Sequence, residues 1–451
     1  TRKIQLNLDT NNITKQIEAN TDLGFNILFD QVTNEQISYK TQDDNIATVN
    51  NTGLVTGKKY GTTKIEVTTN KLPNTVLVEV EVLRKDDITM PKTVSGQDFT
   101  VALKSDGTVW TWGYNGYGQL GLGDKTNRYK PTQINITDVV DIAAGNNHVL
   151  LVTKDGKVYS YGTNSYGQLG RDGNTLLPEE IPNLENIEKV AASNYHSMAL
   201  GKDGSVYTWG YNGNGQLGNG TTISNSIPSK IRLTNITKIE AGEQTSTAID
   251  GDGNLYAWGY NGYGQLGIGD TANRIKPTKS NLQKIKQIAA NEYSTIALTE
   301  DGKIYGAGYN TEGELGLGYN QEKVLKWGKV KDPNGKDDIS NATQIATGRY
   351  HIVVLTNNGK VYSAGYNNVY QLADGTTTNK NVLAPMKDNS DNEMTNIKNI
   401  YASGYCSYVL TNNNEVYAVG YNNYGQQFQN NTATNTKLTK IKTDVEITSI
   451  A

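Results

Sequence analysis

The side chains best suited to metal binding or nucleophilic catalysis are three histidines and one cysteine. All four stand at one register of a repeated pattern, which Phe, Thr and Ser also fill. Its occupants in chain order are Phe99, His148, His196, Thr245, Ser294, His351 and Cys406. Because the histidines belong to different repeats, we expect that they cannot converge at the distances that zinc requires. The sequence predicts no metal site, no cofactor and a buried, unreactive Cys406 thiol.

Two further patterns come close to known ligand loops but lack a necessary part. The stretch from Asp250 to Asn254 starts like a calcium loop, yet the bidentate Glu that closes such a loop is missing. The glycine spacing of the repeated loops is like that of a dinucleotide site, yet no predicted helix follows to present its N-terminus to a phosphate. No Ser-His-Asp grouping can be argued. We therefore expect a protein that is not an enzyme.

Charge and hydropathy exclude two classes of partner. The 42 Lys and Arg residues stand against 45 Asp and Glu residues, a balance that argues against phosphate-driven binding of nucleic acid. No apolar run is long enough to span a bilayer, so we expect no insertion into a membrane. The chain begins at Thr1 with neither an initiator Met nor a signal-like segment, and we expect a processed or excised piece of a longer polypeptide.

The chain is dominated by a repeat whose clearest copy, WGYNGYGQLG, begins at Trp112. Six related segments follow, and every copy carries a glycine at its second position. These glycines are Gly113, Gly162, Gly210, Gly259, Gly308, Gly365 and Gly420. Their spacing of 48 to 57 residues is typical of propellers, solenoids and other arrays.

Each repeat has the same order of predicted elements, and the second copy is an example. A strand over 140–144 is followed by a small turn, a second strand over 149–153, an Asp-Gly turn and a third strand over 158–161. The long glycine-rich loop comes next, and then a fourth strand that is often opened by a proline. Four strands in each of seven repeats predict an all-β protein with a seven-bladed β-propeller over residues 93–451.

The two ends of the repeat array predict how the propeller closes. Pro91 interrupts the segment that should form the opening strand of the first repeat. Residues 445–451 match the opening strands of the other repeats and have no repeat after them. We therefore expect this C-terminal strand to complete the sheet that holds Phe99 to Trp112, which would remove an exposed edge.

Residues 1–84 lack the repeat and alternate apolar with polar side chains in strand-length runs, as at Ile4 and Leu6 and from Val76 to Val82. Turn signals at 50–53 and 58–61 separate short strands. Residues 85–92 are polar and include a proline, which is typical of a linker. We expect a separate β-sandwich in residues 1–84 ahead of the propeller.

Two family resemblances refine this picture. The segment 37–69, with its ATV and GLVTG motifs, resembles the group 2 bacterial immunoglobulin-like domain. That resemblance implies a sandwich of the kind that mostly serves as a spacer or adhesion unit of bacterial surface proteins. Residues 93–451 resemble the regulator of chromosome condensation repeat family, which implies a seven-bladed propeller. Departures from the motif cluster late in the array, so we expect the last three blades to be less regular. Ala307, Ala364 and Val419 replace the aromatic residue, Tyr370 replaces a loop glycine, and Gln427-Phe428 replaces Leu-Gly.

Antiparallel strands place the first turn and the long loop of every repeat on one face of the propeller, the loop face, and the Asp-Gly turns on the other, the turn face. The loop face is rich in Tyr, a frequent anchor of protein interfaces. A tyrosine recurs at one loop position, which favours packing, in Tyr114, Tyr211, Tyr260, Tyr309, Tyr366 and Tyr421. Positions that differ between repeats are better binding candidates. They are Asp98, Tyr117, Asn147, Tyr166, Tyr195, Asn214, Glu243, Tyr263, Glu292, Tyr293, Glu312, Arg349, Tyr350, Tyr405 and Tyr424.

These features together predict a monomeric binding or adhesion module that recognises a protein or a carbohydrate through its loop face. The immunoglobulin-like resemblance implies an extracellular or cell-surface location in a bacterium. A soluble inhibitor or regulator of an enzyme remains the alternative, because proteins that resemble this propeller include exchange factors for small GTPases and inhibitors of β-lactamases. The acidic balance of the chain and its lack of a basic arm weigh against the exchange-factor role.

Overall fold

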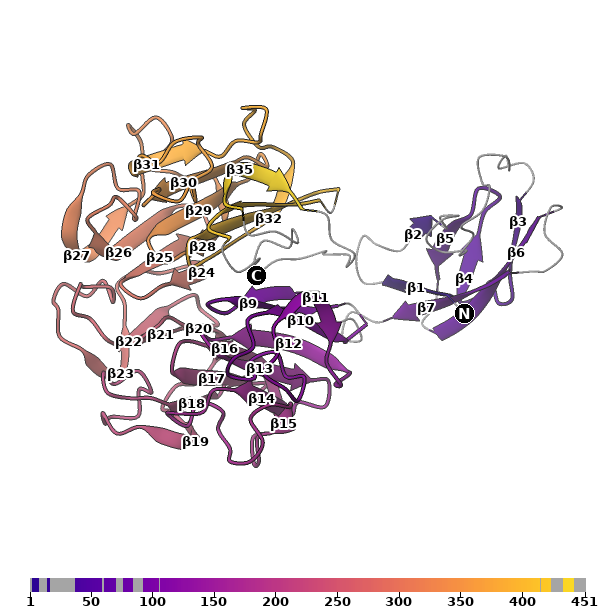
Figure 1. The fold of residues 1–451 in the computed structure, drawn as a ribbon, viewed down its shortest axis with the longest axis horizontal. Coiled ribbons are helices and arrows are strands. Elements are labelled where there is room, and N and C mark those ends of the chain that lie inside the picture. The colour runs from indigo at the N-terminus through magenta and orange to yellow at the C-terminus, as the bar shows by residue number, and fades with distance from the viewer. Residues whose placement is uncertain are drawn as a thin grey trace. The chain divides into compact units, whose positions relative to one another are not determined.

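The computed structural model describes residues 2–7, 14–16, 37–58, 61–69, 76–83, 92–104, 106–413, 415–422 and 433–441. Every regular element named within these ranges is a β-strand, which confirms the all-β class. No helix of the described ranges is long and apolar enough to cross a membrane. Chain contacts separate two units, Thr1–Thr89 and Met90–Ala451, which we call the N-terminal unit and the propeller unit (Figure 1).

The N-terminal unit contains two described sheets. Their strands are β1 (Arg2–Asn7), β2 (Thr14–Gln16), β3 (Ile37–Thr41), β4 (Ala47–Val49), β5 (Leu54–Gly57), β6 (Gly61–Thr69) and β7 (Val76–Leu83). One sheet has the order β1-β7-β6-β3 and the other β2-β5-β4. Strands β1 and β7 pair in parallel, whereas the other pairs are antiparallel. The strands predicted around Ile4 and from Val76 to Val82 are confirmed as β1 and β7.

Both sheets of the N-terminal unit contribute to one buried core. Ala47 and Val55 come from the three-stranded sheet, and Ile65, Val67 and Val78 come from the four-stranded one. Burial of such alternating apolar side chains between two sheets is the main source of stability for a unit of this size. The shared core therefore explains the period-two apolar pattern of this part of the sequence.

The predicted turn at 50–53 is formed and joins β4 to β5. Asn50 Oδ1 accepts hydrogen bonds from the backbone N–H groups of Thr52 at 3.0 Å and Leu54 at 2.9 Å. Gly53 has a φ of 84°, and a Cβ atom there would lie 2.7 Å from the ring of Tyr39. The turn thus needs Asn at its start and Gly near its end.

The propeller unit contains seven described four-stranded sheets, each in sequential strand order (Figure 1). Sheets 1 to 4 are β8 (Lys92–Ser95), β9 (Phe99–Leu103), β10 (Val109–Gly113) and β11 (Arg128–Gln133); β12 (Val139–Ala144), β13 (His148–Thr153), β14 (Val158–Gly162) and β15 (Glu179–Glu180); β16 (Ile187–Ala192), β17 (His196–Gly201), β18 (Val206–Gly210) and β19 (Asn225–Lys230); and β20 (Ile236–Ala241), β21 (Thr245–Asp250), β22 (Leu255–Gly259) and β23 (Arg274–Lys279). Sheets 5 to 7 are β24 (Ile285–Ala290), β25 (Ser294–Thr299), β26 (Ile304–Asn310) and β27 (Gln321–Lys329); β28 (Ala342–Thr347), β29 (His351–Thr356), β30 (Val361–Gly365) and β31 (Lys380–Pro385); and β32 (Ile397–Ser403), β33 (Cys406–Thr411), β34 (Val416–Gly420) and β35 (Asn435–Lys440).

The order of elements predicted for each repeat is confirmed. In sheet 2, β12, β13 and β14 pair as antiparallel neighbours, and β13 joins β14 through the Asp-Gly turn. The motif glycine ends the third strand: Gly162 has a φ of 102°, and a Cβ atom there would lie 2.3 Å from the carbonyl oxygen of Asn147. A side chain at this position would force apart the loop and the neighbouring turn, so the repeat requires glycine.

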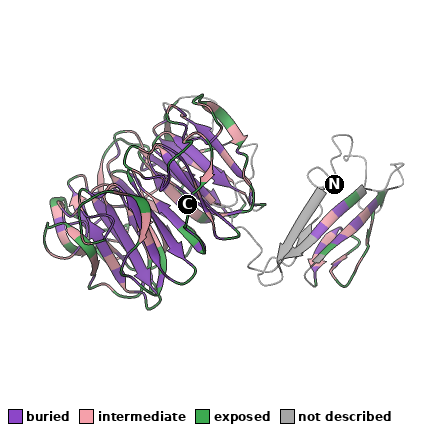
Figure 2. Cartoon of the chain, turned by 90° about the horizontal axis from the view of Figure 1, so that it is seen from below, coloured by how far each residue is buried: buried purple, intermediate pink, exposed green. Residues whose placement is uncertain are grey.

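The cores of the propeller unit lie between neighbouring sheets. Leu150 and Val152 of sheet 2, for example, are buried together with Val190 and Trp209 of sheet 3. Second strands such as β13 are buried along their whole length, and exposed residues occur mainly at loops and outer strands (Figure 2). Trp209 Nε1 also donates a hydrogen bond of 2.9 Å to the carbonyl oxygen of Gln168 in sheet 2. The motif tryptophan is thus a contact between sheets.

Replacement of that aromatic residue disturbs the last sheets less than expected. Sheets 5, 6 and 7 keep all four strands, and only sheet 5 shows a second register shift between its third and fourth strands. The prediction of less regular blades is therefore wrong for the described strands of sheets 6 and 7. Two strained substitutions occur in sheet 6, where Tyr370 and Ala373 replace loop glycines and keep the left-handed conformation with φ values of 66° and 54°.

The first sheet requires a correction. Its innermost strand is β8, which pairs with β9 from Lys92↔Leu103 to Ser95↔Thr100. We predicted that residues 445–451 would pair with this edge of β9, but Lys92–Ser95 pair with it instead. Lys92 therefore belongs to a strand and not to the linker. Residues 84–91 and 442–451 themselves lie outside the described part of the chain. Pro91 is compatible with this arrangement because a proline is tolerated directly before a strand.

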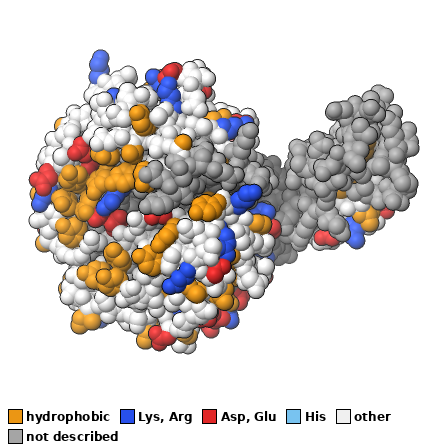
Figure 3. Space-filling view, in the orientation of Figure 1, with side chains coloured by type: hydrophobic (Ala, Val, Ile, Leu, Met, Phe, Trp, Pro, Cys, Tyr) orange, Lys and Arg blue, Asp and Glu red, His pale blue; other side chains and the backbone are white. Residues whose placement is uncertain are grey.

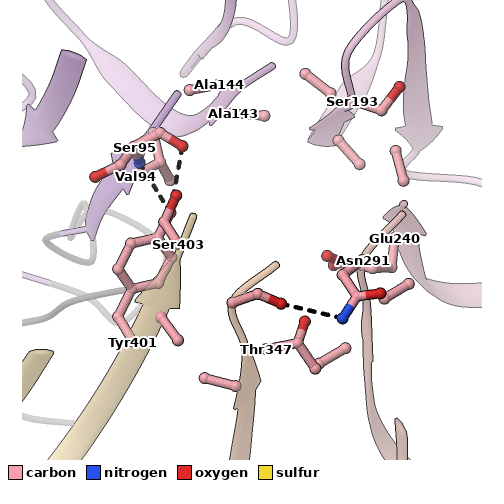
Figure 4. A pocket seen from close by; sticks show the side chains of 18 of the residues that line it. Val94, Ser95, Ala143, Ala144, Ser193, Glu240, Asn291, Thr347, Tyr401 and Ser403 are labelled. Carbon is pink, nitrogen blue, oxygen red and sulfur yellow. Dashed lines mark hydrogen bonds between the residues drawn. The ribbon is translucent and has the colours of Figure 1, made fainter. Parts of the chain in front are cut away.

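The first and last sheets meet through one tyrosine. Tyr401 of β32 lies with its Oη atom 3.0 Å from the backbone N of Ser95 and 3.3 Å from the Ser95 carbonyl oxygen (Figure 4). The phenol hydroxyl can accept from the N–H and donate to the carbonyl at the same time. Sheets 1 and 7 are therefore joined at the inner edge of the propeller.

Candidate functional site

The motif asparagine holds each long loop in shape. Asn115 is fully buried; its Oδ1 accepts a 3.0 Å hydrogen bond from Leu120 N, and its Nδ2 donates to the Asp124 carbonyl oxygen at 2.9 Å. The same bond to the motif leucine recurs in the next five sheets. The pairs are Asn164 with Leu169, Asn212 with Leu217, Asn261 with Leu266, Asn310 with Leu315 and Asn367 with Leu372. The Asn and Leu of the motif are therefore structural.

The motif glutamine connects a loop to the next sheet. Gln119 Oε1 accepts from Tyr117 N at 2.9 Å, and Gln119 Nε2 donates to Asn147 Oδ1 in the first turn of sheet 2 at 3.1 Å. In the corresponding place of sheet 4, Gln265 Nε2 contacts the carbonyl oxygen of Glu292. The loops of sheets 1 and 4 are thus placed against the first turn of the following sheet, whereas Gln216 Nε2 and Gln371 Nε2 are buried without a hydrogen-bond partner among the described residues.

Sheet 5 carries Glu314 where the other motifs have glutamine. Glu314 Oε2 accepts from Glu312 N at 2.8 Å, whereas Oε1 is buried without a hydrogen-bond partner among the described residues. The residue is only 2% exposed, and this burial raises the pKa of its carboxyl to about 7. Near neutral pH this group therefore exchanges between a proton-bearing form that can donate a hydrogen bond and an anion that cannot.

A continuous series of seven tyrosines runs across the loop face of sheets 4 to 7. We call it the tyrosine arc: Tyr260, Tyr263, Tyr293, Tyr309, Tyr350, Tyr366 and Tyr405. Its ring centroids lie between 5.1 and 6.4 Å apart. Most contacts are edge-to-face or tilted, and Tyr293 and Tyr350 stack at an interplanar angle of 20°. Such packing restrains the rings before any ligand binds.

The arc combines variable loop positions with variable turn positions of the following sheet. Tyr263 in the long loop of sheet 4 lies 5.1 Å from Tyr293 in the first turn of sheet 5 and 5.3 Å from Tyr309. A smaller group repeats this arrangement: Tyr166 of sheet 2 lies 5.1 Å from both Tyr195 and Tyr211 of sheet 3. A loop residue of one repeat and a turn residue of the next thus form one surface.

Between these two groups the surface is polar. Asn214 Nδ2 of sheet 3 donates to Gln244 Oε1 of sheet 4 at 2.5 Å, in the place where sheets 2 and 3, and sheets 4 and 5, bring two tyrosines together. In sheet 1, Tyr117 contacts only the ring of Tyr114 among described aromatic residues, at 6.1 Å. Tyr117, Tyr166 and Tyr195 are 52%, 45% and 40% exposed, so these three are more open to solvent than the arc.

Charged groups of the first turns lie beside the arc. Arg349 Nη2 forms an ion pair with Glu292 Oε2 at 3.1 Å, and the Arg349 guanidinium lies 5.5 Å from the centroid of the Tyr350 ring. Burial, together with the neighbouring Glu292 carboxylate, raises the pKa of Glu243 to about 7. Burial also raises the pKa of Asp98. Glu243 and Glu292 therefore lie close together and share the positive charge of one guanidinium, that of Arg349.

A central cavity of about 1280 Å³ lies among the innermost strands of all seven sheets. Its wall includes residues from the first turn of every sheet, so the cavity extends to the loop face. Figure 4 shows part of this wall, with Glu240 of β20 and Tyr401 of β32 on opposite sides. Among the predicted site residues, those that line the cavity are Asp98, Tyr195, Glu243, Glu292, Arg349 and Tyr405.

The other predicted site residues have varied surroundings. Tyr263, Tyr293 and Tyr350 belong to the arc, and Tyr166 belongs to the smaller tyrosine group. Three polar candidates are held by neighbours: Asn147 by Gln119, Asn214 by Gln244, and Glu312 by Asn379. Tyr117 stays apart on sheet 1. Tyr424 lies outside the described residues.

The tyrosine that recurs at one loop position packs on its own loop, as expected for Tyr114, Tyr211 and Tyr260. A Cβ atom at Gly116 would lie 2.1 Å from Tyr114 Oη, and Gly213 and Gly262 are equally close to their tyrosines. Hydrophobic side chains, a class that here includes Tyr, gather in patches over the propeller unit with charged side chains between them (Figure 3). The tyrosines at the recurring position, which pack on their own loops, thus hold the neighbouring variable tyrosines in place.

The histidine register is structural. Each histidine Nε2 contacts a serine hydroxyl of the next sheet: His148 with Ser197 at 2.9 Å, His196 with Ser246 at 2.8 Å and His351 with Ser407 at 2.8 Å. Each serine in turn donates to a loop carbonyl oxygen, so its Oγ accepts from the histidine. Burial lowers the pKa of all three histidines to about 3. They are therefore neutral contacts between sheets.

Cys406, at the same register, is 4% exposed and contacts the carbonyl oxygen of Tyr421 at 2.8 Å. The predicted burial of this thiol is confirmed. Within the part of the chain that the structure describes, no three His, Cys, Asp or Glu side chains gather closely enough to hold a metal ion.

Two acidic residues escaped the sequence analysis. Glu240 stands at a register of the innermost strands that is occupied elsewhere by Val94, Ala143, Ala191, Ala289, Ala346 and Tyr401. Glu314 stands where the other motifs have glutamine. Alignment of the repeats would have shown both, because each is a carboxylate at a position whose other occupants are uncharged.

Comparison with known proteins agrees with this architecture. Residues 41–234 match the RCC1-like domain family, a match that begins inside the N-terminal unit. Residues 252–298 and 301–355 match the regulator of chromosome condensation (RCC1) repeat, and a second description of that repeat matches 236–265, 285–314, 342–371 and 397–426. None of these matches supports the immunoglobulin-like assignment of residues 1–84, which stays a prediction.

Individual relatives are distant. The ultraviolet-B receptor UVR8 of Arabidopsis thaliana is 38% identical over 58 residues, which is 12% of this chain and 13% of that protein. The crystal structure of human WBSCR16 has a TM-score of 0.67 at 20% identity and covers 76% of this chain and 97% of its own. Prp20p of Saccharomyces cerevisiae has a TM-score of 0.65 at 21% identity, with 80% of this chain and 88% of its own covered.

At such identities the structural likeness is one of fold. The repeat matches and the solved structures agree with the sheet order described above. The chain therefore carries an RCC1-like β-propeller built from RCC1 repeats.

Proposed function

We propose that the propeller unit is a binding module that recognises a protein partner through the tyrosine arc and the charged first turns beside it. The observation that carries this proposal is the arc itself, in which variable residues of sheets 4 to 7 form one continuous aromatic surface. Interfaces are enriched in Tyr and Arg at their energetic centres, where restrained rings lose little entropy on binding. Arg349 lies against the arc with its charge paired to Glu292.

A protein fits this surface better than a carbohydrate. Sugars stack on open ring faces, whereas most rings of the arc meet a neighbour edge-to-face. Contacts of this kind leave an uneven surface of ring edges and hydroxyl groups, which suits a shaped protein partner. Carbohydrate recognition is therefore the weaker interpretation of the same tyrosines.

The test compares substitutions on the two faces of the propeller. The variants Tyr195→Ala and Tyr263→Ala remove one tyrosine from each group on the loop face, and Thr108→Ala and Lys157→Ala change the turn face. Partners captured by the wild-type chain should bind the tyrosine variants more weakly, by about 2 kcal/mol for each true anchor. The turn-face variants should bind as the wild type does. Affinity is measured by calorimetry, with circular dichroism as the check on folding. Equal binding by the tyrosine variants would overturn the proposal.

We also propose that the protein acts outside a bacterial cell as an adhesion or surface-binding module. This rests on the resemblance of residues 37–69 to bacterial immunoglobulin-like modules, and on the shared core of the two sheets of the N-terminal unit. Antibody labelling of intact cells of the source organism tests it. Labelling only after cell lysis would instead favour the role of an intracellular enzyme regulator.

A further inference from the structure

Glu240 is a carboxyl group without a hydrogen bond in the wall of the central cavity. It lies on β20, the innermost strand of sheet 4, and its side chain makes no hydrogen bond to any of the described residues. Protein encloses it except toward the cavity, and this burial raises the pKa of its carboxyl to about 7. An uncompensated carboxylate in such a place costs the folded state free energy unless a cation approaches it.

Five cationic residues line the cavity: Lys92, Lys189, Lys238, Lys286 and Arg349. Among them, Lys92 is the one whose charge acts on the Glu240 carboxyl group. Lys92 Nζ lies 3.0 Å from Asp141 Oδ1, and Arg349 is paired with Glu292. Lys92 only partly opposes the rise in the pKa of Glu240. The protein itself therefore leaves the Glu240 carboxylate open to an external cation.

The cavity wall around Glu240 has the composition that a long cationic side chain requires. At the same register the neighbouring sheets present small apolar side chains, namely Ala143, Ala191, Ala289 and Ala346. Glu243 and Glu292 stand closer to the loop face, on the first turns of sheets 4 and 5. A lysine or arginine side chain has an apolar stem and a charged end, and it can place the stem along alanines while its end meets a carboxylate.

We propose that the central cavity takes a lysine or arginine side chain of the protein partner, with Glu240 as its counter-ion at depth and Glu243 at the entrance. This inference rests on the proposed function, because it adds a basic residue to what the tyrosine arc binds. Glu243 stands three positions after Glu240, which is at most about 10 Å along the chain. A side chain that enters beside the arc therefore passes Glu243 and the ion pair of Arg349 with Glu292 before it reaches Glu240.

The test uses three blocked tripeptides as probes: acetyl-Gly-Lys-Gly-amide, acetyl-Gly-Arg-Gly-amide and acetyl-Gly-Gln-Gly-amide. Calorimetric titration of the full chain should show binding of the Lys or Arg peptide but not of the Gln peptide. In Glu240→Gln and Glu240→Ala the affinity should fall about thirtyfold or more, since the loss of one partner of a buried charge pair has an effect of this order. Spermidine serves as a fourth probe for a free polyamine.

The matched control is Glu188→Gln, which makes the same change of charge on the innermost strand of sheet 3 at an exposed site outside the cavity. It should bind the peptides as the wild type does. Glu240→Ala should fold, because four other sheets carry Ala at this register, and both Glu240 variants should melt at or above the wild-type temperature. Unchanged peptide affinity in the Glu240 variants, or binding of the Gln peptide, overturns the proposal.

One further outcome shows whether the cation comes from a free polyamine or from a protein side chain. Another distinguishes failure of this inference from failure of the proposed function. Tighter binding of spermidine than of either cationic peptide makes a free polyamine the occupant and overturns the inference. If the partner is lost from the tyrosine variants but binds the Glu240 variants with wild-type affinity, the proposed function stands and the inference of an inserted cation fails.

Discussion

The two faces of the propeller join neighbouring sheets by different means. On the turn face, the carbonyl oxygen of the turn glycine accepts a hydrogen bond from the first strand of the next sheet, as in Gly107 with Val139 at 3.1 Å and Gly156 with Ile187 at 3.0 Å. The same backbone bond recurs at Gly204, Gly253, Gly302 and Gly359. On the loop face, side chains that differ from sheet to sheet make the connections.

This difference explains where variation gathers in the sequence. A bond between backbone atoms is independent of the side chains, so the turn face can be uniform and still hold the ring together. A contact between side chains can change from one sheet to the next if both partners change. Histidine faces serine at three interfaces, whereas Phe99 and Val149 form an apolar pair at another. We expect substitutions near the loop face to have larger consequences than those on the turn face.

The largest effect is expected for His196→Ala. The substitution empties a fully buried position and removes the partners of Ser193 Oγ at 2.6 Å and Ser246 Oγ at 2.8 Å. A new cavity and the loss of both hydrogen bonds of the imidazole should lower the free energy of unfolding of the propeller unit by about 4 kcal/mol. Urea denaturation followed by tryptophan fluorescence measures it. A loss below about 1 kcal/mol would contradict the structural role of this histidine register.

Glu314→Gln should stabilise the protein at neutral and alkaline pH. The folded pKa of Glu314 is raised to about 7 from the ordinary value of 4.5, so its contribution to stability is present below pH 4.5 and is lost as the pH rises through 7. Glutamine removes this loss and can donate to the next turn as Gln265 does. We expect a gain of about 3 kcal/mol at pH 8 and none at pH 4. An equal gain at both values would show that ionisation is not the cause.

The pH profile of the wild-type protein should be flatter than that of Glu314→Gln. Each buried histidine has its pKa lowered to about 3, so its contribution to stability is complete above pH 6.5 and is lost as the pH falls toward 3. Glu240, Glu243 and Glu314 act in the opposite direction between about pH 4.5 and 7. We expect the two sets to offset each other from pH 4.5 to 6.5.

Removal of one carboxyl group should break this balance. Denaturation of Glu314→Gln at half-unit intervals should give a slope of about 1.4 kcal/mol per pH unit, with stability falling toward acid pH. Below pH 4.5 both proteins should lose stability steeply, because the histidines still take up protons and carboxyl groups with lowered pKa values, such as Asp301 and Asp270, do so as well. A wild-type profile that already slopes from pH 6.5 to 4.5 would show that the carboxyl groups are ordinary.

The smallest effect is expected for Asp155→Ala on the turn face. Its carboxylate accepts a 2.5 Å hydrogen bond from Thr153 Oγ1, a contact within one turn at an exposed site. The backbone bond from Ile187 to Gly156 remains. Stability should change by no more than about 0.5 kcal/mol, and binding through the loop face should be unaffected. A larger loss than that of His196→Ala would reverse the comparison between the faces.

The repeat sequence determined everything that depends on neighbours along the chain. Apolar periodicity, the Asp-Gly turns and the motif glycines specified four strands per repeat and the two faces, because these are local consequences of side-chain alternation and of backbone conformation. The variable loop and turn positions could be recognised in the same way. Predictions of this kind, such as β12 to β14 around the turn at 154–157, are confirmed.

Contacts between repeats were decided only by the tertiary structure, because they join residues far apart along the chain whose side chains meet after the sheets pack side by side. The pairing of Tyr263 with Tyr293 and of His148 with Ser197 belongs to this class. So does the opening strand of sheet 1, which local reasoning dismissed because of Pro91 although the edge of β9 accepts Lys92–Ser95. Glu240 faces a central cavity for the same reason, since a cavity exists only when all seven innermost strands have been brought together.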